Sequence, residues 1–290
     1  MGPNSIAGLR RRFKTGVESG LNENLAREIL ELHTLGVNGG YSQEDVIGLA
    51  KAISGWSHGA QRLKRDTAPV HGHFEFKKYF HEPDSKVVMG KRYKSRNVKT
   101  GEKVLKDLAR HPSTAKFIAT KVARHFIADV PPPSAIDKLT RVFLKSKGDL
   151  ADVSKALIEL DEVWAVPAPK VKNHYDLMLS AYRASGQMTF TQTDFQEPLE
   201  AFAQVPFFAP SPAGWPDTAS EWISPESLMR RVEWLRELAA KLPPDWNPQQ
   251  FMDDLIGPIA TDETRTWVSR APSPDAAMAL VLSSPEFQRR

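Results

Sequence analysis

The sequence of 290 residues contains no cysteine. Without a thiol the chain cannot form a disulfide, a thiolate zinc site, an iron–sulfur cluster or a C-x-x-C-H haem attachment, and it has no cysteine nucleophile. An absence of cysteine fits an oxidising or a reducing compartment equally well. The lack of cysteine therefore excludes these kinds of site, and it does not indicate in which compartment the protein is located.

Long apolar runs and targeting segments are missing as well. No run approaches the roughly 18 apolar residues that cross a bilayer, and the arginines of the N-terminal MGPNSIAGLRRRFK are not followed by an apolar segment. A membrane span and a secretory signal are therefore not predicted, and the chain as given is expected to be cytoplasmic.

The motifs of the commonest catalytic sites are also absent. The chain has no H-E-x-x-H, no G-x-S-x-G, no Walker loop and no G-x-G-x-x-G. Metalloprotease, serine hydrolase, nucleotide and dinucleotide chemistry consequently lack sequence support.

What the sequence does contain is a series of helix start and stop signals. Ser224 and Ser273 each precede a proline and a helical stretch, and the three prolines at 131–133 end another helix. At least seven helices follow from such signals. We predict a mainly α fold, an irregular multi-helix bundle with at most a short β-hairpin near residues 71–95, forming a single helical domain over residues 1–290.

One stretch, HGHFEFKKYF at 71–80, alternates with a period of two and predicts a short strand. His71 and His73 share a face of that strand, and imidazole is a ligand of divalent metals. Three ligands on one strand would span about 13 Å, so Glu75 is too distant to join them, whereas His81 could approach across a hairpin. No cofactor is predicted, and a divalent metal at the two histidines is kept as a hypothesis.

The stretch NENLAREILELH is predicted to be a helix with two faces. At about 100° per residue, Asn24, Arg27, Glu28 and Glu31 lie on one side, whereas His33 falls among the leucines. A regular helix therefore cannot bring both glutamates and the histidine to one metal. The polar side is typical of i,i+4 pairs on a surface. A buried polar network or an inward carboxylate pair is the alternative.

A second histidine lies on an apolar helix face, in TAKFIATKVARHFI. We predict that His33 and His125 are mostly buried and that at least one ring nitrogen of each is hydrogen-bonded. A sharper hypothesis places the two imidazoles close together, with Lys121 one turn before His125 as a neighbouring cation.

Positive charge is concentrated in the first part of the chain. Residues 1–110 hold 20 Lys and Arg against 12 Asp and Glu, whereas residues 111–290 hold 19 against 23. Within the basic part, KRYKSRNVKTGEKVLK at 91–106 interleaves cations with one tyrosine, a composition that fits binding to nucleic acid or another polyanion. A solvated loop is the alternative interpretation of this segment.

Several long segments, in this order, resemble the bacterial family called domain of unknown function 1800. The resemblance covers essentially the whole chain and implies a mainly helical protein. The segments that carry it are LNENLAREILELHTLGVNGGYSQEDVIGLAKAISGW, ARHPSTAKFIATKVARHFIADVPPPSAIDKLTRVFLKSKGDL, PKVKNHYDLMLSAYRASG, PSPAGWPDTASEWISPESLMRRVEW and LSSPEFQRR.

The resemblance also singles out individual positions. They mix both faces of their helices, which favours burial of some polar residues against other helices. His71 and His73 lie outside the pattern, and Asp84 stands where the family usually has glycine. The matching positions are Asn22, Glu23, Asn24, Arg27, Glu28, Glu31, His33 and Gly36, then His111, Pro112, Lys121, Arg124, His125, Phe126 and Asp129.

Three functions are compatible with these patterns. The first is a structural or protein-interaction role, with a buried polar network. The second is a hydrolytic or metal-assisted enzyme, in which Glu28 or Glu31 is the base and His33 or His125 its acid–base partner. The third is a polyanion or nucleic-acid binder that uses residues 91–106. The binding candidates are Asn24, Arg27, Lys121 and Arg124.

Members of the resembled family usually run well beyond 290 residues, and the matched part is their C-terminal portion. We therefore expect an abbreviated or truncated member, and export of the longer members stays open. If helices before residue 22 are missing, the helices at 22–35 and 43–56 would present apolar surface to a partner protein or to a second copy.

Overall fold

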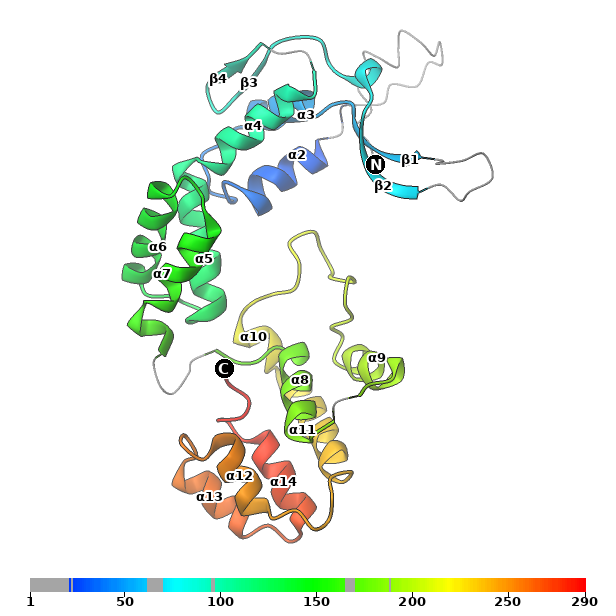
Figure 1. The fold of residues 1–290 in the computed structure, drawn as a ribbon, viewed down its shortest axis with the longest axis vertical. Coiled ribbons are helices and arrows are strands. Elements are labelled where there is room, and N and C mark those ends of the chain that lie inside the picture. The colour runs from blue at the N-terminus through cyan, green and yellow to red at the C-terminus, as the bar shows by residue number, and fades with distance from the viewer. Residues whose placement is uncertain (1–20, 22, 62–69, 95–96, 165–169, 188) are drawn as a thin grey trace. The chain divides into compact units, whose positions relative to one another are not determined.

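The computed structural model describes residues 21–290 apart from 22, 62–69, 95–96, 165–169 and 188. The prediction of a mainly α fold is confirmed, since the described residues form helices α2 to α14 and four short strands (Figure 1). The chain divides into two compact units, residues 1–120 with 137–156 and residues 121–136 with 157–290. A single domain over residues 1–290 stays a prediction, because it concerns the association of these units.

The first unit combines helices with two β-hairpins. The bounds of its elements are α2 (Asn24–Glu28), a π-helix (Ile29–His33), α3 (Gln43–Ala52), β1 (Trp56–Gln61), β2 (Val70–Phe76), a 3₁₀ turn (Lys78–Phe80), β3 (Lys86–Val88), β4 (Lys91–Tyr93) and α4 (Lys99–Ala109). Parts of α5 (Pro112–Phe126), α6 (Pro133–Lys145) and α7 (Leu150–Ile158) complete it.

The strands form two antiparallel pairs where the sequence predicted at most one hairpin. The predicted strand is β2, and its partner is β1, whereas β3 pairs with β4. The expectation that Trp56 ends a helix is wrong, because α3 stops at Ala52 and Gly55 turns the chain with a φ of +83°. Only glycine adopts that conformation at little cost, so β1 can begin one residue later.

Helix α3 shows how its sequence ties the unit together. Ser42 and Asp45 form the capping box that the Ser-x-x-acid spacing indicates. The second carboxylate oxygen of Asp45 accepts a hydrogen bond of 2.6 Å from the Met89 backbone N–H in the β3–β4 turn. Gly48 packs directly against the backbone of Val87, so one helix cap and one glycine fix the hairpin on α3.

The predicted helix at 22–35 is shorter and less regular than expected. Regular α-helix ends at Glu28, and π-helix continues to His33. Bonding from i to i+5 places more residues in each turn, so each residue advances by less than 100° around the axis. His33 therefore stops short of the buried side, and the prediction that it is mostly buried is wrong, since the residue is exposed.

Among the described residues around α2 and α3, two large apolar side chains are exposed. They are Leu25, at 40% exposure, and Val37, at 67%. Self-association through an apolar surface in this region stays a prediction. No helix in the described part of the chain is long and apolar enough to cross a membrane.

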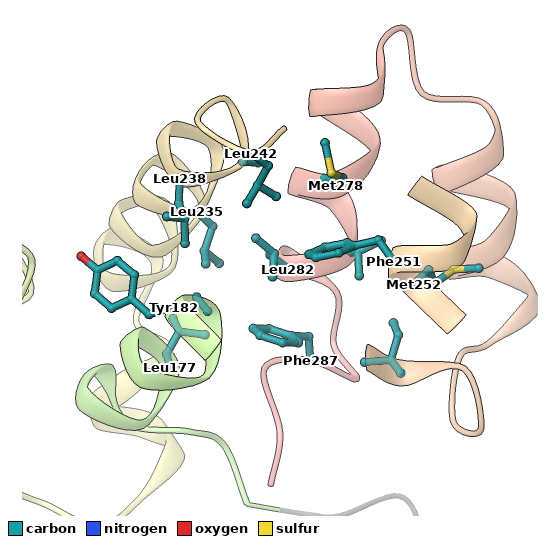
Figure 2. Packing of buried hydrophobic residues seen from close by; sticks show 14 of the residues in the cluster. Leu177, Tyr182, Leu235, Leu238, Leu242, Phe251, Met252, Met278, Leu282 and Phe287 are labelled. Carbon is teal, nitrogen blue, oxygen red and sulfur yellow. The ribbon is translucent and has the colours of Figure 1, made fainter. Parts of the chain in front are cut away.

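The second unit is built from helices around one apolar core (Figure 2). Its elements, besides the ends of α5 to α7, are a 3₁₀ turn (Asp161–Trp164), α8 (His174–Ala184), α9 (Gln192–Ala201), α10 (Ala219–Trp222), α11 (Pro225–Ala239), α12 (Pro248–Ile256), α13 (Asp262–Ser269) and α14 (Pro274–Ser283). The Ser-Pro starts predicted at Ser224 and Ser273 are confirmed for α11 and α14.

The core of this unit explains why its helices stay together. Leu177 of α8, Leu235 of α11 and Leu282 of α14 are fully buried and belong to one cluster with Phe287 and Met252 (Figure 2). Burial of such side chains contributes about 1.5 to 3 kcal/mol each. The C-terminal segment therefore packs into the core, and Val171 and Arg289 form a β-bridge at its edge.

Candidate functional site

The polar side of α2 and the π-helix forms surface pairs. Arg27 lies 3.6 Å from Glu31, the predicted i,i+4 pair, and also donates to Gln43 over 2.8 Å. The hydroxyl of Tyr41 donates to Glu31 over 2.6 Å. Burial first, and then this carboxylate, raise the pKa of Tyr41 to about 12. Glu31 thus acts as an acceptor that holds its own neighbours, while Glu28 is half-buried and Asn24 is exposed.

The predicted metal histidines do not gain further ligands in the described residues. His73 is exposed and pairs across the sheet with Gly59, and the side chain of His71 lies outside the described residues. No group of three histidine or carboxylate side chains in the described chain is placed to hold a metal ion. A metal at these positions stays a hypothesis.

His81, the predicted additional ligand, lies instead in a buried contact. Its Nδ1 is 2.8 Å from the carbonyl oxygen of Ser54, and its Nε2 is 3.3 Å from Nζ of Lys86. Burial is the main reason why the pKa of His81 lies below its usual value. This imidazole serves the packing of the first unit.

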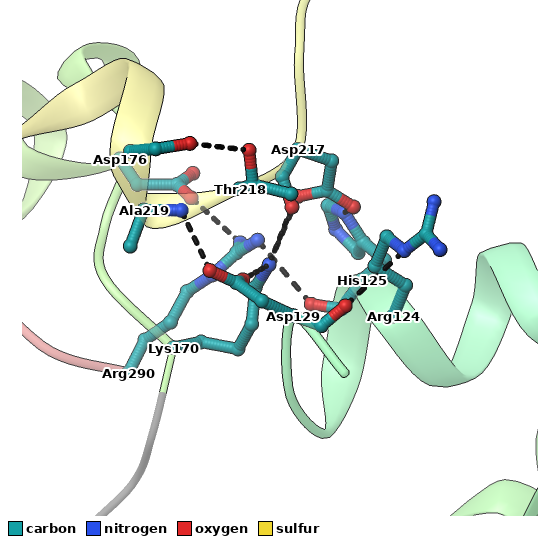
Figure 3. A network of polar contacts seen from close by, with 10 residues as sticks. Arg124, His125, Asp129, Lys170, Asp176, Asp217, Thr218, Ala219 and Arg290 are labelled. Carbon is teal, nitrogen blue, oxygen red and sulfur yellow. Dashed lines mark hydrogen bonds and ion pairs between the residues drawn. The ribbon is translucent and has the colours of Figure 1, made fainter. Parts of the chain in front are cut away.

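The largest polar network of the second unit is centred on Lys170 (Figure 3). Its side chain is only 3% exposed, and its ammonium lies 2.6 Å from Asp129 Oδ1 and 3.3 Å from Asp217 Oδ1. It also donates to the backbone carbonyl of Asp217 over 2.8 Å. The other oxygen of Asp129 accepts the backbone N–H of Ala219 over 2.7 Å. Three segments far apart in sequence therefore meet at one ammonium group.

The electrostatics of Asp129 follow from these partners. Burial by itself would raise the pKa of its carboxyl, but the Ala219 N–H and the ammonium of Lys170 outweigh it, so the pKa lies below the usual value. Asp129 therefore keeps its negative charge to a lower pH than an ordinary aspartate does.

His125 stands at the edge of the same network. Its Nδ1 lies 3.2 Å from Oδ2 of Asp217, which confirms that one ring nitrogen has a hydrogen-bond partner. The residue is only partly buried, less than predicted, since 42% of its side chain is exposed. The residue belongs to the last turn of α5, where no further turn covers the ring, and Phe126 flanks it at 4.6 Å between ring centroids.

The other predicted residues of α5 lie close in sequence but differ in role. Arg124 donates from Nε to the carbonyl oxygen of Asp129 over 3.3 Å, and Lys121 is exposed. His33 belongs to the first unit and His125 to the second. The hypothesis that these two imidazoles lie close together therefore stays a prediction.

The network is balanced in charge, which limits its chemistry. Lys170 pairs with the carboxylates of Asp129 and Asp217 at 2.6 and 3.3 Å, and Arg290 pairs with Asp176 at 2.6 Å. Arg124 donates to the backbone carbonyl of Asp129. A His–Asp pair can accept a proton. Among the described residues, however, no hydroxyl group hydrogen-bonds to His125. The arrangement is that of a structural clamp with a histidine at its edge.

A second group of charged side chains, in the first unit, is far from balanced. An open hollow of about 450 Å³ lies between β4 and α4. We call it the basic pocket, and its lining residues are Lys91, Arg92, Tyr93, Lys94, Lys103, Lys106, Asp107 and Arg110. Six cations thus face one carboxylate. The predicted segment 91–106 supplies five of them. Its residues 91–93 belong to β4 and residues 99–106 to α4, so the described part of the segment is a loop only at 94 and 97–98.

The single carboxylate of the basic pocket is already occupied. Asp107 accepts hydrogen bonds of 2.6 Å from Lys91 Nζ and from the hydroxyl of Tyr93. Burial alone would raise the pKa of Asp107, but these two donors and the charge of Lys91 hold it below the usual value. Lys94, Lys103, Lys106 and Arg110 form no ion pair with a carboxylate in the described part of the chain.

Sequence reasoning found the basic segment from its composition but missed Lys170 and Asp217. These two lie within segments that carry the family resemblance, and that was the only signal for them. Their partners are 41 and 47 residues away, so no local spacing relates them.

Comparison with known proteins gives one match. A family model described as "Protein of unknown function (DUF1800)" matches residues 2–289, nearly the entire chain. Neither the curated proteins nor the solved structures contain a significant match.

Proposed function

Since the chain belongs to the DUF1800 family, whose description assigns no activity, we propose a function from the site geometry: a binding protein that holds a polyanion in its basic pocket. The observation that carries the proposal is the lining of a hollow of about 450 Å³, which contains six cations and one carboxylate. This is the alternative function predicted from the sequence, a polyanion or nucleic-acid binder that uses residues 91–106.

The charge excess supplies the driving force. Cations that find no carboxylate in the protein keep counterions from the solvent, and a polyanion that displaces them releases those ions with a gain in entropy. The polar network around Lys170 lacks this property because its cations and carboxylates are matched. A ligand of negative charge is therefore expected at the first unit.

The positions of the cations suit an extended ligand. Lys103 and Lys106 lie on one side of α4, and Arg110 is the C-cap that directly follows it, about 10 Å from Lys103 along the axis at 1.5 Å per residue. The other side of the hollow carries Arg92 of β4 and Lys94, the residue that directly follows β4. Two rows of charge on a helix and a strand form a groove that can follow a chain of anionic groups.

The pocket favours recognition of charge over recognition of bases. Its only aromatic residue is Tyr93, which is 6% exposed and donates its hydroxyl to Asp107. Stacking on exposed rings is the usual basis of binding to single-stranded bases. The expected ligand is therefore bound through its phosphate, sulfate or carboxylate groups, independently of sequence.

The test is calorimetric titration with oligo(dT) and with inorganic polyphosphate at low salt. The double variant Lys103→Gln/Lys106→Gln is expected to bind both probes about tenfold more weakly or worse. The matched control, Lys116→Gln/Lys145→Gln, removes the same charge from exposed positions of α5 and α6 and should keep most of the affinity. Equal losses in both variants, or no binding by the unchanged protein, would overturn the proposal.

A further inference from the structure

The second unit contains a stretch with the opposite charge. Residues 242–264 hold five acidic side chains and no Lys or Arg. They form the loop before α12, α12 itself and the start of α13. Acidic residues on a surface are common, so this composition becomes informative only through the hollow that the stretch surrounds.

That hollow has a volume of about 400 Å³ and lies at the start of α12. Two aromatic rings, Trp246 and Phe251, contribute to its lining, with ring centroids 5.8 Å apart and planes inclined by 40°. Asp245 and Asp254 add carboxylates, and the lining contains no cation. We call it the aromatic–acidic pocket. The remaining lining residues are Ala184, Asn247, Gln250 and Leu255.

The combination of rings and carboxylates selects one kind of ligand. The face of an indole ring attracts an organic cation, and neighbouring carboxylates add a direct electrostatic attraction. An anion would meet two negative charges without a compensating one. We propose that the aromatic–acidic pocket binds an organic cation, an alkylammonium or guanidinium group carried by a small amine or by a lysine or arginine side chain.

One local feature opposes a cation, and the structure reduces it. A helix start carries partial positive charge from free backbone N–H groups. At α12, however, the side chain of Asn247 accepts the N–H groups of Gln249 and Gln250 at 2.9 and 3.2 Å. Asp245 precedes this cap, and Asp254 accepts a 2.7 Å hydrogen bond from the amide of Gln250. The carboxylates therefore dominate the charge facing the hollow.

An inorganic metal ion fits this place less well. Metal sites need three or more close oxygen or nitrogen ligands, and the described residues contain no such group of histidine and carboxylate side chains. A ring wall favours a weakly hydrated, larger cation, which guanidinium and quaternary ammonium groups are. The pocket volume is within the usual range for small ligands.

The experiment compares charged and neutral probes of the same shape. Choline, its uncharged carbon isostere dimethylbutanol and ethylguanidinium are titrated by ligand-observed NMR. Short acetylated peptides with a single lysine or arginine form the second arm, which distinguishes a free amine from a side chain. Choline or ethylguanidinium is expected to bind at least fivefold more tightly than dimethylbutanol.

Two variants locate the binding. Asp254→Asn and Trp246→Leu are each expected to weaken binding of the cationic probes about fivefold, and Asp262→Asn and Trp267→Leu, changes of the same kind at exposed positions of α13, should leave it unchanged. Equal affinity for dimethylbutanol and choline would show a merely apolar hollow and overturn the proposal. The proposal would also be overturned if the α13 variants weakened binding of the cationic probes as much as the pocket variants do.

Discussion

Lys170 shows how one side chain can organise a large part of the second unit. Its ammonium group is almost fully buried and contacts two carboxylates that come from segments before and after it in the chain. Such a group is costly to desolvate, and it is stable only while its partners remain. Lys170 therefore serves to hold the segments of Asp129 and Asp217 in place rather than to bind a ligand.

Replacement of Lys170 by methionine keeps the apolar stem and removes the charge. We expect a loss of about 2 kcal/mol in the free energy of unfolding, less than the roughly 3 to 5 kcal/mol of a fully buried pair. The reason is that Asp129 and Asp217 stay 29% and 35% exposed and can be hydrated. Urea denaturation measures the loss, with the exposed Lys241→Met as control. A loss no larger than that of the control would contradict the clamp.

His174 is the second residue with a measurable signature. It is 4% exposed, stacks on Phe202 at 4.7 Å and lies 3.2 Å from the hydroxyl of Ser227. Burial, and then the charges of Arg231 and Arg230, lower its pKa from 6.5 to about 3. The folded protein therefore keeps this imidazole neutral where the unfolded chain would protonate it.

The consequence is a loss of stability on acidification. Between pH 6.5 and about pH 3 the unfolded state binds the His174 proton and the folded state does not, so stability falls by at most about 1.4 kcal/mol per pH unit. His174→Phe keeps the stacking and should reduce this slope, while the exposed His33→Gln should not. The free energy of unfolding is measured by denaturation at several pH values from 7 to 4.5. An identical slope of this free energy against pH in the unchanged protein and both variants would refute the role of His174.

At the scale of elements, caps with a serine and proline were predicted from the sequence, and the helices they start are present. Helices α12 and α13 also begin with capping side chains, Asn247 and Thr261, but they were not predicted and have only 9 and 8 residues. In helix α4 the N-cap residue Val98 has no capping side chain, and the side chain of Asn97 accepts the Lys99 N–H instead. The π-helix before Thr34 could not be predicted, because its bonding depends on how the turn after it packs.

The basic pocket and the network around Lys170 differ in how much of each could be predicted from the sequence. Five cations of the basic pocket lie in one short segment, so composition identified them, and the sixth, Arg110, is the C-cap of α4. The contacts around Lys170 and those of Tyr41 with Glu31 join residues that only tertiary structure brings together. The exposure of His33 and His125 was not predicted either. A helical wheel assumes a regular helix, and it represents neither the end of a helix nor a π-helical turn.

The contact of α3 with the β3–β4 hairpin yields a test at this scale. A Cβ added to Gly48 would overlap the carbonyl oxygen of Val87. Gly48→Ala should therefore destabilise the protein by more than about 1 kcal/mol, although alanine is normally better than glycine in a helix by a similar amount. Lys51→Ala, on the exposed side of α3, should change stability by less than about 0.5 kcal/mol. Thermal unfolding compares the two, and stabilisation by Gly48→Ala would show that the close contact is absent.

At the scale of the whole molecule, charge is divided between the parts of the chain. Residues 1–110 have an excess of eight cations, 20 against 12, and residues 111–290 an excess of four acids, 23 against 19. The basic pocket and the aromatic–acidic pocket follow this division. We therefore expect the two pockets to prefer ligands of opposite charge.

The salt dependence of oligo(dT) binding tests the central claim most directly. The slope of log K against log salt counts the cations that replace counterions, at about 0.7 per contact for a single strand. We predict a steep negative slope for the unchanged protein, a slope shallower by about 1.4 for Lys103→Gln/Lys106→Gln, and no change for Lys116→Gln/Lys145→Gln. An unchanged slope in the first variant would show that the basic pocket is not where the polyanion binds.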